Sequence, residues 1–148
     1  MSDQLRAKGV HFEELFHQPT FHATDEAHRL GLPVPDVIKT IAIKTGSGVA
    51  LAGIPACCRL DLQRVREVTG DHHARLATEA EIQHDFPGYE LGALPPFGRT
   101  LKRALYVDPL VMEHDEIVFA ASPTQSLRIH TADLLRDEDA LIVSMVGA

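Results

Sequence analysis

The sequence is poor in cysteine, in long apolar runs and in positive charge. Its two cysteines, Cys57 and Cys58, are neighbours among 148 residues. Neighbouring cysteines rarely bridge each other, so no disulfide framework is expected and a reducing cytoplasm fits. No uninterrupted apolar run reaches the roughly 20 residues that a membrane helix needs. The first ten residues carry Asp3, Arg6 and Lys8 and lack a hydrophobic signal core, so we expect no export signal.

The shortage of positive charge is uneven along the chain. Lys and Arg number 14 against 21 Asp and Glu, which gives a net charge of −7. This balance argues against avid, non-specific binding of nucleic acid. From residue 39 to 103, however, nine basic residues face seven acidic ones, a local charge of +2, and the rest carries −9. Two interpretations stay open: the middle meets a polyanion, or it is a solvated surface on which charges cluster by chance.

Several catalytic signatures are also missing. The Gly-x-Ser-x-Gly elbow is absent, although other Ser-His-Asp arrangements stay open. The residues from Lys44 to Gly48 only superficially resemble a phosphate-binding loop, and no Rossmann glycine fingerprint occurs. The nine histidines show no HExxH motif and no paired Cys/His spacing, so no metal and no cofactor are expected. Cys57 and Cys58 are more typical of packed or edge cysteines than of a reactive thiol.

The length favours a single domain over residues 1–148, with enough chain to bury a core. Short apolar runs separated by Gly and Pro predict strands at 10–16, 37–43, 49–54, 101–107, 116–121, 127–130 and 141–146. The runs at 37–43 and 49–54 flank a glycine-rich tip, which indicates a hairpin. Short helices interspersed with these strands predict an α/β (mixed) fold.

Capping residues locate the expected helices. Thr24 is expected to cap a helix that runs through Leu30, with Gly31 after its end, and Asp61 is expected to cap another with Leu62, Val65 and Val68 on its apolar face. Thr78 and Glu81 have the spacing of a capping box, and Pro87 and Gly88 end that helix. Thr131 is expected to cap a last short helix. Residues 91–98 contain two Gly and two Pro and are expected to be irregular.

Lys39 stands out because it lies in an apolar strand. Strand alternation puts it on one face with Val37, Ile41 and Ile43 and puts Thr40 on the other. The side chain either extends to the rim, with its ammonium in water, or projects into a partly apolar pocket. In a pocket it would be a fixed cation for a phosphate or a polarised carbonyl.

A second feature is the segment from Gly88 to Gly98. Its Pro-Pro pair stiffens the loop, and its glycines allow a ligand to approach the backbone closely. Such a loop can direct N–H and C=O groups at a ligand without a reactive side chain. The pattern alone favours a purely structural connection between a helix and a strand.

Together these features resemble the YbaK/prolyl-tRNA-synthetase-associated domain family, free-standing relatives of the editing insertion of bacterial prolyl-tRNA synthetase. The resemblance covers roughly Val10 to Leu135 and rests on segments in a fixed order: Ile38-Lys39-Thr40, Ile54-Pro55-Ala56, Arg59-Leu60-Asp61-Leu62, Gly92-Ala93-Leu94-Pro95-Pro96-Phe97-Gly98 and Tyr106-Val107-Asp108. It implies a curved, barrel-like mixed β-sheet flanked by short helices. It also implies a trans-editing aminoacyl-tRNA deacylase, an enzyme that hydrolyses mischarged tRNA carrying a small amino acid.

The resemblance also implies site residues. Lys39 matches the family's functional lysine, and Gly92 and Pro96 match its Gly-x-x-x-Pro loop, which makes Lys39 and Gly92 the expected catalytic pair. Thr40, Pro96, Phe97, Gly98 and Ser122 are the expected substrate-binding residues. Ser122 stands where relatives commonly have glycine, so it would narrow or polarise the pocket.

The expected partners are mischarged aminoacyl-tRNA and an aminoacyl-tRNA synthetase, with neither a membrane nor DNA. Arg99, Lys102 and Arg103 follow the glycine loop and are candidates for contact with the tRNA backbone. A plain surface role for these three stays open. An alternative function is a non-catalytic module of the same fold that binds tRNA or a synthetase, since fold does not fix function. A hydrolase acting on another small ester is a third reading.

Overall fold

Two β-sheets meet at one parallel bridge in the computed structural model, which describes residues 1–20, 22–90, 92–136 and 140–147. The first sheet has the order β1-β7-β6, with β1 at Phe12–Phe16, β6 at Glu116–Ser122 and β7 at Gln125–His130. The second has the order β4-β2-β3-β5-β8, with β2 at Ile38–Thr45, β3 at Gly48–Pro55, β4 at Arg75–Leu76, β5 at Leu105–Val107 and β8 at Ala140–Ile142. The bridge pairs Val37 with Val118.

The mixed α/β class with short helices is confirmed, but the sheet does not close into a barrel. Each sheet described here has two end strands, and the ends of the larger one, β4 and β8, pair over only two and three residues. Because the sheets join at a single bridge, their strands cannot form one continuous ring of hydrogen bonds. The fold is therefore a pair of open sheets.

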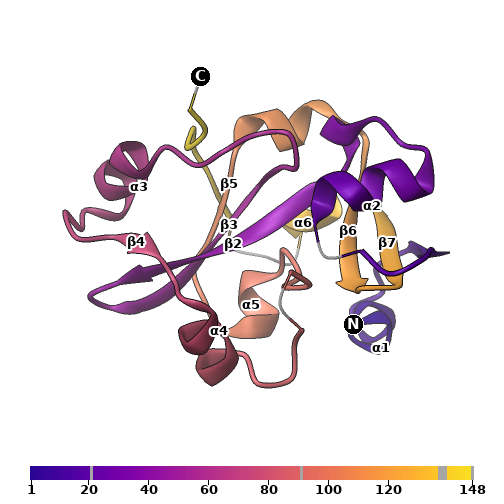
Figure 1. Ribbon diagram of the computed structural model, residues 1–148, viewed down its shortest axis with the longest axis horizontal. Coiled ribbons are helices and arrows are strands. Elements are labelled where there is room, and N and C mark those ends of the chain that lie inside the picture. Colours follow the sequence, from indigo (N-terminus) through magenta and orange to yellow (C-terminus); the bar gives the residue numbers. More distant parts are fainter. Residues whose placement is uncertain (21, 91, 137–139, 148) are drawn as a thin grey trace.

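Short helices surround these sheets. They are α1 (Ser2–Ala7), α2 (Ala23–Leu30), α3 (Leu62–Thr69), α4 (Glu79–Asp85), α5 (Gly98–Leu101) and α6 (Asp133–Arg136), with 3-10 turns η1 (Val34–Asp36) and η2 (Pro109–Glu113). Figure 1 shows α2 beside β6, α3 beyond the β2–β3 hairpin on the opposite side, and α4 and α5 below that hairpin. The helix α2 buries Ala27 against Val37, Ala56 and Val118, so it covers the seam between the sheets.

The predicted hairpin is confirmed as the longest pairing of the molecule. Strands β2 and β3 pair antiparallel from Ile38–Pro55 to Thr45–Gly48. The alternation of β2 is also confirmed: Ile38 and Ala42 belong to the main core, whereas Ile43 packs in a separate cluster on the other face. The main core lies between the sheets and contains the largest buried rings, Phe97 and Phe119.

Two of the predicted helix caps are confirmed. The carboxylate of Asp61 accepts hydrogen bonds from the first turn of α3, and Thr78 and Glu81 form a full capping box at α4. The Thr24 cap is wrong, because α2 begins at Ala23 with His22 as its N-cap. Thr20, two positions before that N-cap, donates its N–H to the Pro123 carbonyl at 2.8 Å. This tertiary contact anchors the chain just before the helix.

The strand expected at 101–107 is wrong in its first half. Leu101 ends α5, and the chain doubles back so that the N–H of Arg103 donates to the Gly98 carbonyl at 2.8 Å. Only Leu105–Val107 forms β5. Two short elements, α1 and β4, were not predicted because neither carries a clear cap or alternation. Within the expected irregular segment 91–98, residue 91 lies outside the described residues.

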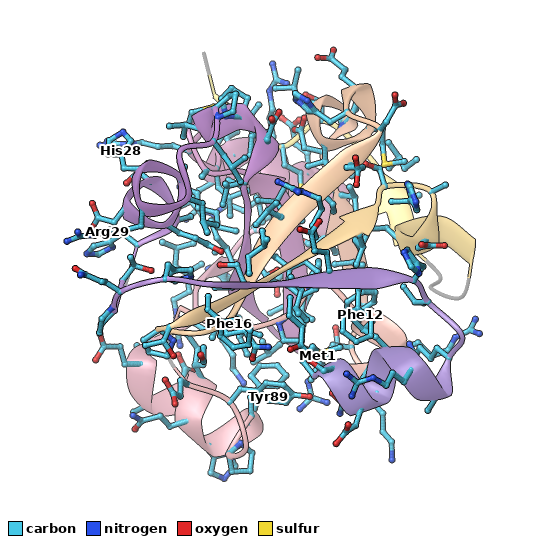
Figure 2. All side chains as sticks on the ribbon, turned by 90° about the vertical axis from the view of Figure 1, so that its right-hand side faces the viewer. Met1, Phe12, Phe16, His28, Arg29 and Tyr89 are labelled. Carbon is cyan, nitrogen blue, oxygen red and sulfur yellow. The ribbon has the colours of Figure 1, made fainter. Side chains whose placement is uncertain are left out.

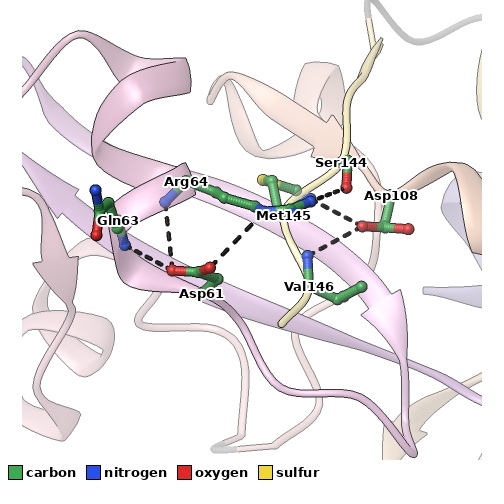
Figure 3. Close-up of polar contacts among 7 residues, drawn as sticks. All are labelled: Asp61, Gln63, Arg64, Asp108, Ser144, Met145 and Val146. Carbon is green, nitrogen blue, oxygen red and sulfur yellow. Dashed lines mark hydrogen bonds and ion pairs between the residues drawn. The ribbon is translucent and has the colours of Figure 1, made fainter. Parts of the chain in front are cut away.

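The end of the chain is fastened by Asp108, which is 1% exposed. Its Oδ1 accepts the N–H of Leu110 at 3.0 Å, and its Oδ2 accepts those of Met145 at 2.9 Å and Val146 at 3.2 Å. Figure 3 shows the two bonds from Met145 and Val146 to Asp108. In addition, the Asp61 N–H donates to the Met145 carbonyl at 2.8 Å. The C-terminal segment is thus bound along the residues that follow Cys58.

The helix α1 packs where the glycine loop begins. Met1, Phe12 and Tyr89 are half-buried against the main core, and Figure 2 shows them grouped between α1 and β1. The Gln4 side chain donates to the Tyr89 hydroxyl at 3.4 Å. In contrast, Phe16 at the end of β1 is 70% exposed. The helix therefore covers one flank of the loop that leads to Gly92.

Candidate active site

Lys39 lies near one end of β2, opposite Ile54 of β3. Its side chain is partly buried, and this burial lowers the pKa of Lys39. The neighbouring Arg59 cation lowers it further, whereas the thiols of Cys58 and Cys57 act in the opposite direction. The ammonium is thus near the turn that follows β3, in an environment less polar than water.

The two cysteines beside Lys39 are free thiols whose sulfurs are 3.8 Å apart. Burial raises the pKa of the Cys58 thiol, and its contact with Cys57 raises it further. A raised pKa keeps the thiol protonated and therefore weakly nucleophilic. This agrees with the sequence reading that favours packed or edge cysteines.

The loop from Gly92 to Gly98 is held in place by burial. Gly92 has φ +80°, a left-handed conformation that glycine adopts without strain, and the Ala93 N–H closes the turn onto the Glu90 carbonyl at 3.0 Å. Residues 93–98 are all buried. Phe97 meets Phe119 edge to face with ring centroids 5.6 Å apart. A backbone anchored in this way can present its polar groups at a fixed position.

A small cavity lies beside Gly92. It is lined by Thr20, His22, Ala23, Glu26, Gly92, Ala93, Ala120, Ser122 and Pro123 and encloses about 10 Å³. That space corresponds to about one water molecule. Its walls combine small apolar side chains with a carboxyl, an imidazole and hydroxyl groups.

The cavity contains two of the sequence-predicted residues, Gly92 and Ser122. The Ser122 hydroxyl also accepts the Thr124 N–H at 3.2 Å, so it shapes the turn between β6 and β7. The other residues predicted for the catalytic and substrate-binding site are not among the described residues that line this cavity. Pro96, Phe97 and Gly98 are buried in the loop, and Thr40 lies on the β2 face shared with Ile38 and Ala42.

The strand register relates Lys39 to this cavity. The bridge between Val37 and Val118 is parallel, and the next residues on the same faces are Lys39 and Ala120. Ala120 is part of the cavity wall. Lys39 and the cavity residue Ala120 thus each lie two positions beyond the bridge at the seam that α2 covers.

The predicted tRNA contacts lie elsewhere. Lys102 and Arg103 line a cleft of about 460 Å³ together with Thr45 and Ser47, at the other end of β2. Six residues of strand separate Lys39 from Thr45, a span of roughly 20 Å. Arg103 is 3.7 Å from Asp85 and its guanidinium lies 5.3 Å from the centre of the Phe86 ring. Arg99 is exposed on α5.

Sequence reasoning missed a chain of three polar side chains beside the cavity. The Ser126 hydroxyl donates to Oε2 of Glu26, and Nε2 of His17 lies 2.8 Å from the same hydroxyl oxygen. Glu26 is 1% exposed and Ser126 is fully buried. Burial raises the pKa of Glu26, against the opposing effects of Ser126 and His17.

A signal for Glu26 was present in the sequence. Residues 23, 26, 27 and 30 have the i, i+3, i+4, i+7 spacing of a core-facing helical stripe. Three of them are Ala23, Ala27 and Leu30, which pack at the seam. A glutamate at the fourth position of such a stripe is a buried carboxyl, which is rare without a reason.

Two negative findings complete the description of the site. Within residues 1–20, 22–90, 92–136 and 140–147, no three His, Cys, Asp or Glu side chains gather closely enough to hold a metal ion. No helix in the described part of the chain has the length and apolar character needed to cross a bilayer.

Comparisons with known proteins bear on the family and the fold of the chain. The model of the aminoacyl-tRNA editing domain matches residues 17–136. A proline–tRNA ligase of Fervidobacterium nodosum is 30% identical over 96 residues, which cover 65% of this chain and 16% of the ligase. The chain thus matches only a small part of that relative.

Two solved structures share the whole fold. The hypothetical protein APE2540 superposes with a TM-score of 0.89 at 23% identity, covering 99% of this chain and 98% of that one. A candidate trans-editing enzyme for prolyl tRNA synthetase superposes with a TM-score of 0.87 at 23% identity, covering 99% and 94%. At this identity the likeness establishes the fold.

Proposed function

Because the chain belongs to the aminoacyl-tRNA editing domain family, we propose that it is a trans-editing deacylase. Its substrate is tRNA mischarged with a small amino acid, and residues 1–148 act as one editing domain. The observation that supports this proposal is the anchored Gly92 turn, which borders a cavity of about 10 Å³ whose wall residue Ala120 lies, like Lys39, two positions beyond the Val37–Val118 bridge. We place its action in the cytoplasm, where tRNA is charged.

The reaction is hydrolysis of an ester. Water adds to the ester carbonyl carbon, the bond from that carbon to the ribose oxygen breaks, and the ribose oxygen takes a proton. The products are free amino acid and uncharged tRNA. An aminoacyl ester is activated, so positioning and electrostatic stabilisation suffice without a covalent nucleophile. This agrees with the protonated state favoured for the Cys58 thiol.

Each predicted catalytic residue has a distinct role in this proposal. The Lys39 ammonium neutralises the terminal phosphate or the oxyanion that develops on the carbonyl. Gly92 offers backbone groups to the substrate or to the attacking water. As a glycine in a left-handed turn, it has no side chain that would block their approach. A free ribose hydroxyl of the substrate helps to activate the water.

Selection by size follows from the cavity. A space that admits about one water-sized group leaves no room for a large side chain next to the ester. One methylene changes such discrimination by about 1–3 kcal/mol. The wall residues Ala93, Ala120 and Ser122 then decide which small amino acids are accepted.

The test is a deacylation assay with tRNAs carrying alanine, serine, threonine or cysteine. Lys39→Ala should lower kcat/KM by about 100-fold or more, the usual effect of removing one group that stabilises an oxyanion. Lys44→Ala is the matched control, because Lys44 is a lysine on the same strand near its far end. Its rate should stay within about threefold of wild type.

Three results would count against the proposal. Wild-type turnover by folded Lys39→Ala removes the role of Lys39. Stoichiometric binding of tRNA without turnover supports the non-catalytic module of the same fold. Hydrolysis of small esters without tRNA, and no activity on the tRNA panel, supports a different ester hydrolase.

A further inference from the structure

The cavity beside Gly92 has an acidic wall that the proposed mechanism leaves unused. Glu26 lies in the first turn of α2 and lines the cavity together with Gly92 and Ala93. It is 1% exposed. Burying a carboxylate is costly unless it is hydrogen-bonded and paired with a positive charge. Its presence at this position therefore calls for a partner.

Part of that requirement is met by the protein. Ser126 of β7 donates its hydroxyl hydrogen to Oε2 of Glu26. Among the described residues, Glu26 accepts its side-chain hydrogen bond through Oε2, and Glu26 lines the cavity, so Oε1 is the oxygen that a bound group could use. Ser126 is itself fully buried, which fixes the direction of the carboxyl.

The hydrogen bonds of Glu26 continue through Ser126 to His17. Nδ1 of His17 lies 2.8 Å from the Gln18 carbonyl oxygen, which only accepts, so Nδ1 carries a hydrogen. If the Ser126 hydroxyl donates to Glu26, then Nε2 of His17 must donate to Ser126 at 2.8 Å. The described residues that line the cavity include the imidazole of His22 but no lysine or arginine.

We propose that Glu26 binds the α-ammonium group of the aminoacyl ester. This inference rests on the proposed deacylase function. An ammonium group is about the size of a water molecule, so it matches the single group that the cavity admits. It supplies the positive charge and the donors that the buried carboxyl lacks on that side.

The position of the ammonium explains why such a contact would serve catalysis. In an aminoacyl ester the amino nitrogen is two bonds from the carbonyl carbon that water attacks. A carboxylate that holds the nitrogen therefore fixes the carbonyl as well, against the Gly92 turn. The side chain of the amino acid is then confined by Ala93 and Ala120, so Glu26 acts by positioning and the alanines by exclusion.

The experiment compares two esters that differ only at the α-substituent. Alanyl-tRNA carries the ammonium, and lactyl-tRNA carries a hydroxyl of nearly the same size. The matching α-hydroxy ester is used instead if the wild-type protein prefers another amino acid of the panel. For wild type, kcat/KM relative to spontaneous hydrolysis should be about 10- to 100-fold higher for the amino ester, the range of a charge-assisted hydrogen bond.

Glu26→Gln should lower the rate on the amino ester by that factor and leave the rate on the hydroxy ester nearly unchanged. A role of Glu26 in folding alone would lower both rates together. Glu26→Asp keeps the charge and should restore part of the preference. Glu90→Gln is the control, because Glu90 precedes the same turn and does not line the cavity. Thermal unfolding of each variant checks that it is folded.

The outcomes separate the two proposals. If wild type accelerates both esters equally, the role of Glu26 is overturned even when no variant folds, and the deacylase function stands. An unchanged preference in Glu26→Gln has the same meaning. If wild type hydrolyses no ester of the panel, the deacylase function fails and this inference fails with it.

Discussion

Replacing Asp108 by Asn should loosen the C-terminal segment and destabilise the protein. The carboxylate accepts one backbone N–H from Leu110 through Oδ1. It accepts two more through Oδ2, from Met145 and Val146 (Figure 3). An asparagine has one carbonyl oxygen. In its best orientation it keeps the two C-terminal bonds and turns its NH₂ group toward the Leu110 N–H.

The size of the effect follows from these contacts. The Leu110 N–H is only partly buried, so leaving it unpaired costs about 1–2 kcal/mol, the lower part of the range for a buried group, and the two bonds that lose their charged acceptor each weaken by about 0.5–1 kcal/mol. Together they give a loss of about 3 kcal/mol. For a domain of this size, that corresponds to a fall in Tm of roughly 6–12 °C.

The assay is thermal unfolding combined with hydrogen exchange. The amides of Met145 and Val146 should exchange faster in Asp108→Asn, and so should that of Asp61, which donates to the Met145 carbonyl. Asp3→Asn is the control, because Asp3 is exposed and pairs only with Arg6 among the described contacts. If Asp108→Asn unfolds at the wild-type temperature, Asp108 does not hold the C-terminal segment.

Three further predictions concern charge and packing. Hydrogen bonds from Arg75 and Thr78 hold the pKa of Glu81 at about 2, so the stability that Glu81 contributes above its unfolded pKa is lost as the pH falls through this value. Urea unfolding should show that wild type loses more stability than Glu81→Gln between about pH 6 and pH 2.5; equal losses would contradict this. Gly98→Ala would bring a Cβ within 2.6 Å of the Arg103 carbonyl oxygen, and urea unfolding should show a loss of about 1–3 kcal/mol. Gly88→Ala, where the new Cβ meets nothing within 4 Å, should be neutral; a similar loss in both would refute the packing argument. If Lys102 contacts tRNA, Lys102→Gln should reduce the slope of log affinity against log salt by about one, and an unchanged slope removes it from the interface.

Local patterns allowed much of the fold to be predicted. The alternation in β2 identified both faces of the hairpin because the period of a strand is fixed by its backbone. The caps at Asp61 and Thr78 were found because their hydrogen bonds are made within one turn of the same segment. The resemblance of ordered motifs then indicated the family, which the match over residues 17–136 confirms.

Contacts between distant segments could not be predicted in the same way. The pairing of Val37 with Val118 brings together two strands far apart in the sequence, and no local pattern specifies that register. The partner of Glu26 is likewise 100 positions away, at Ser126. The loop that contains Phe97 was correctly predicted to be irregular. Its burial depends on the contact of Phe97 with Phe119 of β6, a strand distant in the sequence.

Thr40 and Lys39 show the limit of reasoning from adjacency. The two residues are neighbours in sequence, yet they are on opposite faces of β2. The Thr40 hydroxyl is buried and has no hydrogen-bond partner among the described residues. Its contribution to a substrate site therefore stays a prediction, separate from that of Lys39.

The seam between the sheets has a consequence for how such a domain can diversify. The wall of the cavity is drawn from three separate stretches, at residues 20–26, 92–93 and 120–123, while Lys39 comes from a fourth. A substitution in one of the stretches that line the cavity can change the shape of the cavity without altering the β2–β3 pairing that holds Lys39. If the proposed roles hold, substitutions at Ala120 or Ser122 can change selectivity while Lys39, Gly92 and Glu26 stay in place.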